Sequence, residues 1–103
     1  MLSGVVRAFV LAQLGIVELW SGDLDAATGH LERAYATAVE EASEWTALAA
    51  ASQLAMARLL RGDLARAVRH ADDAVGLAER HGWARSEPAG AAYTVRAAVL
   101  IMR

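Results

Sequence analysis

Residues 21–27 read SGDLDAA, and residues 61–67 read RGDLARA, 40 positions further on. The two phrases match at four places: Gly22 and Gly62, Asp23 and Asp63, Leu24 and Leu64, Ala27 and Ala67. Glycine just past a helix end enters the left-handed backbone region without a Cβ penalty. Aspartate one residue later caps the next helix by accepting from its free N–H groups. Each phrase is therefore predicted to be the tight corner of a helical hairpin.

Segments in which apolar residues recur at helical spacing flank both corners, and they predict an all-α fold. Five antiparallel helices are expected at about Leu2–Ser21, Leu24–Ala42, Glu44–Leu60, Leu64–Arg80 and Pro88–Met102. In the first of them, apolar residues recur at spacings of three and four: Phe9, Val10, Leu14, Val17 and Trp20. Ser43 is a predicted N-cap, in a junction without glycine. Gly82 is the predicted end of the fourth helix, and Pro88 lies in the first turn of the fifth.

The later helices have clear apolar sides, and their expected buried residues can be named. The second helix should bury Leu24, Ala27, Leu31, Ala34, Tyr35 and Ala38. The third should bury Leu48, Ala51, Leu54, Ala55 and Leu59. The fourth should bury Ala67, Val68, Ala71, Ala74, Val75 and Ala78.

Composition limits the class of protein. The chain has 103 residues, 56% of them hydrophobic, and this fits one small domain or part of a larger one. It has no cysteine, which excludes disulfides and thiolate metal sites. The longest uncharged run, residues 45–57, is shorter than a membrane span, and Gln13 and Glu18 interrupt the apolar start. We therefore expect a cytoplasmic protein without membrane contact.

Charge is distributed unevenly along the chain. The net charge is −2, but residues 1–45 hold seven acids and two arginines, whereas residues 46–103 hold five acids and eight arginines. Neither half has the strongly basic face of a nucleic-acid-binding domain, so direct nucleic-acid binding is not expected. Arginines cluster around the second corner, where we expect either a solvated rim or an acidic partner, such as another copy's first hairpin: Arg58, Arg61, Arg66 and Arg69.

The fifth predicted helix repeats the first and third. Arg103 corresponds to Arg61 at a step of 42, and the next corner would follow it. We expect a single repeat domain over residues 1–103, with repeats at about 2–42 and 44–82 and a half repeat at 86–103, forming a piece of a longer array. Apolar residues of this helix surround its axis, which predicts self-association through it: Tyr93, Val95, Val99, Leu100, Ile101 and Met102. An exposed N-terminal flank offers end-to-end stacking as the alternative: Val5, Val6 and Val10.

These features resemble the tetratricopeptide repeat, a helical hairpin with Leu-Gly or Leu-Ala in its first helix, Gly-Asp at the turn and spaced alanines in its second helix. The first copy has Leu14-Gly15, Gly22-Asp23, Ala27, Leu31 and Ala34. The second has Leu54-Ala55, Gly62-Asp63, Ala67, Ala71 and Ala74, and Tyr93 and Ala97 resemble the start of a third. The resemblance implies a right-handed solenoid. The period of 40–42 is longer than the usual ~34 and is similar to that in MalT-type regulators of the LuxR family, where such repeats sense ligands and contact proteins.

Histidines and paired acids are the candidates for a metal site or a catalytic site. His30 and His70 hold equivalent places, but we expect both on the outer side of their hairpins, too far apart for one metal ion. His81 is expected to interact with the helix C-terminus. Adjacent carboxylates in Glu40-Glu41 and Asp72-Asp73 diverge around the helix, so they do not converge on one substrate atom. We therefore expect no enzyme activity, no cofactor and no metal.

The candidate binding surface is the concave side, which the first helices of stacked hairpins line. It offers ten residues: Phe9, Gln13, Ile16, Trp20, Gln53, Met56, Leu60, Val95, Ala98 and Met102. Ordinary packing inside the array is the alternative for each of them, but together they exceed one buried stripe. We expect a groove for a protein, a peptide or a small-molecule effector, within a transcription regulator. A general adaptor and a helical segment of an enzyme with its active site elsewhere remain the alternatives.

Overall fold

Five helices joined by short corners form the computed structural model, which describes residues 3–102. They are α1 (Gly4–Trp20), α2 (Leu24–Glu40), α3 (Glu44–Leu60), α4 (Leu64–His81) and α5 (Glu87–Met102). Residues 3–102 contain no strand, so the all-α prediction is confirmed. The predicted helix start at Leu2 and the repeat equivalent Arg103 lie outside the described residues.

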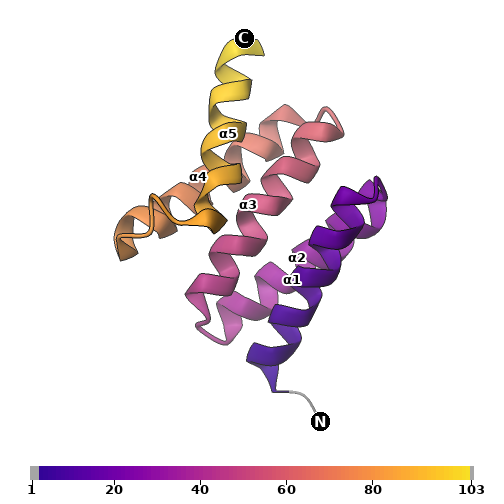
Figure 1. The fold of residues 1–103 in the computed structure, drawn as a ribbon, viewed down its shortest axis with the longest axis vertical. Helices are drawn as coiled ribbons and strands as arrows, with labels where there is room; N and C mark the ends of the chain where they lie inside the picture. The colour runs from indigo at the N-terminus through magenta and orange to yellow at the C-terminus, as the bar shows by residue number, and fades with distance from the viewer. Residues whose placement is uncertain (1–2, 103) are drawn as a thin grey trace.

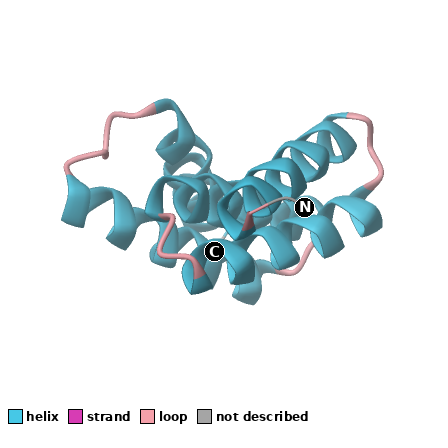
Figure 2. Ribbon diagram, turned by 90° about the horizontal axis from the view of Figure 1, so that it is seen from below, coloured by secondary structure: helices cyan, strands magenta, loops and turns pink. Residues whose placement is uncertain are grey.

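Consecutive helices pack against each other as hairpins in two layers. In Figure 1, α1, α3 and α5 lie nearer the viewer, and α2 and α4 lie behind them. Besides its chain neighbours, α3 also packs on α5 and, over a smaller area, on α1. Figure 2 shows the same array from below, with short loops joining the helices. Because α3 contacts the other four helices, it is the centre of the fold.

Both Gly-Asp corners have the predicted geometry. Gly22 and Gly62 adopt φ of +87° and +81°. The Gly22 N–H donates to the carbonyl of Leu19 at 3.2 Å, and the Asp23 N–H donates to that of Glu18 at 2.9 Å. This pair of bonds is the Schellman motif, which satisfies carbonyls left free at a helix end. The second corner repeats both bonds, so one backbone design ends α1 and α3.

The next residue of each corner caps the following helix. An oxygen of Asp23 accepts from the Ala26 N–H at 3.2 Å, and one of Asp63 accepts from the Arg66 N–H at 3.3 Å. Ser43 holds the same N-cap position before α3, but its side chain makes no capping bond. The N-cap prediction is therefore confirmed for the two aspartates, and for Ser43 in position only.

The left-handed residue recurs every 20 positions, which the sequence did not reveal. Gly22, Ala42, Gly62 and Gly82 all have positive φ. Ala42 reaches φ +55° with the same two backbone bonds, to the carbonyls of Val39 and Ala38. Alanine is strained there because its Cβ approaches a carbonyl oxygen. This residue leaves the helical region, so α2 ends at Glu40 rather than at the predicted Ala42.

The buried sides of α2, α3 and α4 agree with prediction, whereas α1 is different. The residues predicted to be buried in α2, α3 and α4 are all buried or half-buried. In α1 the buried residues are small, apart from one leucine: Ala8, Ala12, Gly15 and Leu19. The large residues that marked its helical period are exposed: Phe9, Val10, Leu14, Val17 and Trp20.

Gly15 explains why α1 presents its small residues to α2. A Cβ built on Gly15 would lie 2.6 Å from Cγ of Leu31, a side chain that is fully buried. It would also lie 3.3 Å from the Leu31 backbone nitrogen. The two helices therefore approach so closely at this point that only glycine fits, and the bulkier residues of α1 take the other side.

α5 buries one side and exposes the other. Val95 and Val99 lie in the core and Tyr93 packs against it, but Leu100, Ile101 and Met102 are exposed. The six apolar residues therefore do not share one buried face, as predicted. Among residues 3–102, no helix has both the length and the apolar character needed to cross a membrane.

Candidate functional site

A largely apolar cavity lies between α1 and α3 and is called here the α1–α3 groove. It has a volume of about 350 Å³. Its walls come from α1, α3 and the first turn of α5, and so from the helices that the sequence placed on the concave side. The lining residues are Phe9, Ala12, Gln13, Ile16, Trp20, Trp45, Thr46, Ala49, Gln53, Glu87 and Pro88.

Helical geometry explains how α1 supplies one wall. Phe9, Gln13, Ile16 and Trp20 follow one another at steps of four, three and four, which places them on one face of the helix. Of these four residues only Ile16 packs against a core cluster, because mainly small residues of α1 fill its interface with α2. Trp20 is 81% exposed and Phe9 is 54% exposed. Large aromatic surface is thus held open to solvent along the groove.

Two glutamines add polar groups to the apolar walls. Gln13 and Gln53 are repeat equivalents, 40 residues apart, and they face the groove from α1 and α3. Each carboxamide offers two N–H donors and one carbonyl acceptor. A backbone peptide group presents the complementary N–H and C=O. The groove therefore combines aromatic contact surface with amide hydrogen bonding at matching positions of two repeats.

The sequence did not single out Trp45, although it lies in the groove at the start of α3. Its ring meets Trp83 edge to face, with centroids 5.0 Å apart, and Trp83 stacks on His81 at 4.5 Å. His81 also pairs with Glu44, the first residue of α3. These contacts hold Trp45 in place and give His81 a partner besides the helix end. A tryptophan two residues after the predicted N-cap Ser43 was the signal available in the sequence.

Five of the ten predicted binding residues lie outside this groove. Val95 is fully buried in the core, so its prediction as a surface binding residue is wrong. Met56 and Ala98 are half-buried, and Met56 packs against the core clusters. Leu60 and Met102 are exposed near the ends of α3 and α5. Phe9, Gln13, Ile16, Trp20 and Gln53 are the ones that the structure brings together.

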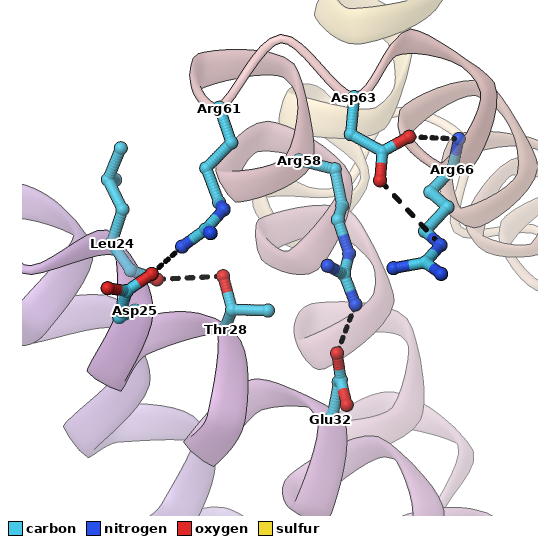
Figure 3. A network of polar contacts seen from close by, with 8 residues as sticks. All are labelled: Leu24, Asp25, Thr28, Glu32, Arg58, Arg61, Asp63 and Arg66. Carbon is cyan, nitrogen blue, oxygen red and sulfur yellow. Dashed lines mark hydrogen bonds and ion pairs between the residues drawn. The ribbon is translucent and has the colours of Figure 1, made fainter.

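A second, polar groove lies on the other side, between α2 and α4, with α3 beneath it. This α2–α4 groove has a volume of about 400 Å³, and it is lined by Glu32, Tyr35, Leu54, Arg58, Arg66, Arg69 and His70. Arg58 pairs with Glu32 inside it (Figure 3). Burial, followed by the negative charge of Asp73, raises the pKa of the Tyr35 phenol, so this hydroxyl stays protonated.

Most of the arginine cluster is paired within the chain. Arg58 bonds to Glu32 and Arg61 to Asp25, so the acidic partner comes from α2 of the same molecule (Figure 3). Arg66 lies 3.6 Å from a carboxylate oxygen of Asp63. Of the four, only Arg69 makes no ion pair with another residue in 3–102. The arginines expected as a solvated rim or as a site for an acidic partner are therefore mostly paired within the molecule. Ion pairs between arginines of α3 and acidic residues of α2 thus connect the two neighbouring hairpins.

The equivalent histidines have different surroundings. Nδ1 of His30 lies 2.6 Å from Oε1 of Glu18 in α1. His30 therefore faces α1, and the prediction that it lies on the outer side of its hairpin is wrong. Nδ1 of His70 is buried and has no hydrogen-bond partner. Burial, followed by the charge of Arg58, lowers the pKa of His70. No group of three or more metal-ligating side chains occurs in residues 3–102.

The paired acids remain on the surface, where Asp72 lies 3.5 Å from Arg96 of α5. Asp73 and both glutamates of residues 40–41 are exposed.

Comparison with known proteins gives no further guide: no family model, no curated protein and no solved structure matches this chain.

Proposed function

We propose that this chain is a non-enzymatic protein-interaction module that binds a peptide segment in the α1–α3 groove. The observation that carries the proposal is the gathering of exposed Phe9, Trp20 and Trp45 in one groove with Gln13 and Gln53. Exposed contiguous apolar surface of this kind marks interaction sites. Aromatic side chains also contribute strongly to binding energy at protein interfaces, because they bury much area in few rotamers.

Selection from a random peptide library tests this function. We expect enriched peptides to bind the purified chain, and Phe9→Ala to weaken their binding about tenfold or more, because truncating a central aromatic contact costs more than ~1 kcal/mol. Leu60→Ala is the matched control, since Leu60 is equally exposed but lies outside the groove. Equal losses in the two variants, or no enriched peptide, would contradict the proposal.

A small-molecule effector is the second candidate, and the size of the groove favours it. About 350 Å³ lies at the lower end of the range for ligand pockets. A small molecule of that size would fit inside the groove, whereas a peptide would also extend past its ends. Lengthening a selected peptide by several residues should therefore tighten its binding if the groove binds a peptide, and should leave it unchanged if the groove holds only a small group.

The narrower proposal is that the module belongs to a right-handed solenoid of the tetratricopeptide type in a bacterial transcription regulator. It is supported by the resemblance of the Gly-Asp-Leu corners and the 40-residue step to the repeats of MalT-type regulators. The gene's full reading frame tests it. An ATPase module before the repeats and a helix-turn-helix domain after them would agree with it, and their absence would favour a general adaptor.

We also propose that copies of the chain self-associate through the end of α5. Leu100, Ile101 and Met102 form a continuous exposed apolar run, with Ile101 84% exposed. Burying one such side chain stabilises a contact by roughly 1.5–3 kcal/mol, and a two-fold arrangement closes it. Light scattering should show a dimer that Ile101→Glu converts to monomer. If Val10→Glu has that effect instead, the contact uses the exposed flank of α1.

A further inference from the structure

The second hairpin lacks a carboxylate at a place where the first hairpin has one. A step of 40 residues matches Glu18 to Arg58 and His30 to His70. In the first hairpin the two residues contact each other, with 2.6 Å between the carboxylate oxygen and the imidazole nitrogen. In the second hairpin both positions are basic, so the same backbone arrangement brings a guanidinium to an imidazole.

The consequence is visible in the hydrogen bonding. Within residues 3–102, four side chains have a buried polar atom without a partner: Ser52, Arg58, His70 and Ser86. Two of them, Arg58 through Nε and His70 through Nδ1, line the same α2–α4 groove. The Arg58 side chain is only 12% exposed. A buried polar group without a partner is costly, and Arg58 Nε can only donate, so this part of the groove has too few acceptors.

Further donors face the same space. Figure 3 shows the guanidinium of Arg66 extending from α4 toward that of Arg58, and both residues line the groove together with Arg69. Glu32 neutralises one of these three arginines and Asp63 lies near a second, and Arg69 has no carboxylate within ion-pair distance among residues 3–102. The protonated phenol of Tyr35 is a further possible donor. The groove therefore has an excess of positive charge and of hydrogen-bond donors.

We propose that the α2–α4 groove binds an oxyanion, a carboxylate or phosphate group, between Arg58, Arg69 and His70. The anion supplies the kind of negative charge that Glu18 supplies in the first hairpin, where Arg58 now occupies the equivalent position. The guanidinium of Arg69 donates to its oxygens, and the neighbouring charges of Arg58 and of protonated His70 help to balance it. Guanidinium groups bind both kinds of oxyanion through paired N–H bonds.

His70 itself provides the readout, because a bound anion favours its protonated form. The charged groups that act on it are Glu32 of α2, Arg58 of α3, and Arg69 and Asp73 of α4. We would follow the imidazole signals of all three histidines by NMR while adding sodium phosphate, sodium acetate or sodium chloride at matched ionic strength. His30 and His81 serve as internal controls, since each already pairs with a glutamate.

We expect a saturable change at His70, and a raised His70 pKa, with phosphate or acetate and not with chloride. The anion that saturates at the lower concentration identifies the ligand as a phosphate or a carboxylate group. Arg69→Gln should weaken binding about tenfold, as loss of a charged hydrogen bond does. Arg85→Gln, outside the groove, should leave it unchanged.

Arg58→Glu rebuilds the first-hairpin pair in the second hairpin. It should abolish the response to added anions and raise the pKa of His70 in their absence. The proposal is overturned if neither anion changes the His70 signals beyond the effect of chloride, if all three histidines respond alike, or if Arg69→Gln binds the anion as tightly as the parent chain.

Discussion

The two hairpins share a backbone design but use equivalent positions differently. Each has a left-handed glycine followed by an aspartate cap, and each presents a glutamine to the α1–α3 groove. Leu14 is nevertheless exposed, whereas its equivalent Leu54 is buried. The difference follows from their neighbours, because α1 packs mainly on α2 while α3 is surrounded by four helices. Main-chain geometry is thus set within a hairpin, whereas side-chain burial depends on where the hairpin lies in the stack.

The largest expected effect concerns the closest helix contact. Gly15→Ala should destabilise the fold by about 1–3 kcal/mol, because the added Cβ would overlap the buried Leu31 side chain. Gly29→Ala on α2 is the matched control. No atom lies within 4 Å of its added Cβ, so it should stabilise the helix by about 0.5–1 kcal/mol. Urea unfolding curves measure both, and a neutral Gly15→Ala would mean that α1 lies further from α2.

The second comparison concerns the left-handed residues of two corners, Gly62 and Ala42. Gly62→Val should cost about 1 kcal/mol or more, because a β-branched residue resists the left-handed backbone. Ala42→Gly should instead stabilise the chain by up to about 1 kcal/mol, since Ala42 holds that conformation under strain. Thermal melts of the two variants should move in opposite directions. Shifts of the same sign would show that the corners do not share one geometry.

Caps give a smaller contrast. Asp23→Ala and Asp63→Ala should each cost about 1 kcal/mol, because each removes the bond that its side chain accepts from the next helix. Ser43→Ala should cost less, since the Ser43 side chain makes no capping bond. Denaturant midpoints with unchanged slopes would measure the three values. An equal loss of stability in Ser43→Ala would mean that the Ser43 side chain makes a capping hydrogen bond, which contradicts the structure.

The smallest expected effect is on how the stability of the chain depends on pH, and it comes from His70. The pKa of His70 is lowered on folding, so the unfolded chain binds this proton more readily. The stabilising contribution is therefore complete above the unfolded pKa of about 6.5 and is lost as pH falls below it. His70→Gln should make stability less dependent on pH in that acid range. An identical pH profile in variant and parent would contradict the burial of His70.

Sequence reasoning predicted the corners well because their signals are local. Gly22, Asp23 and their equivalents specify a conformation through their own chemistry, whatever surrounds them. Ala42 escaped prediction because alanine carries no such signal, and only the four regularly spaced positive φ values reveal its role.

The binding surface was harder to predict, since burial depends on tertiary neighbours. Periodicity alone did not distinguish the side of α1 that packs, which is defined by small residues and by the fit of Gly15 against Leu31. The same limit explains the assignment of buried Val95 to the surface and the omission of Trp45 from the groove. The match of Arg58 to Glu18 was readable from the 40-residue step, but its meaning required the Glu18–His30 contact.

The central claim, that the α1–α3 groove binds a peptide, is tested most directly by NMR mapping of a library-selected peptide on the isotope-labelled chain. We predict the largest shifts at the indole N–H groups of Trp20 and Trp45 and at the side-chain amides of Gln13 and Gln53. Residues of the α2–α4 groove should remain unchanged. Shifts that gather instead around Arg58 and His70, or at the end of α5, would contradict the account.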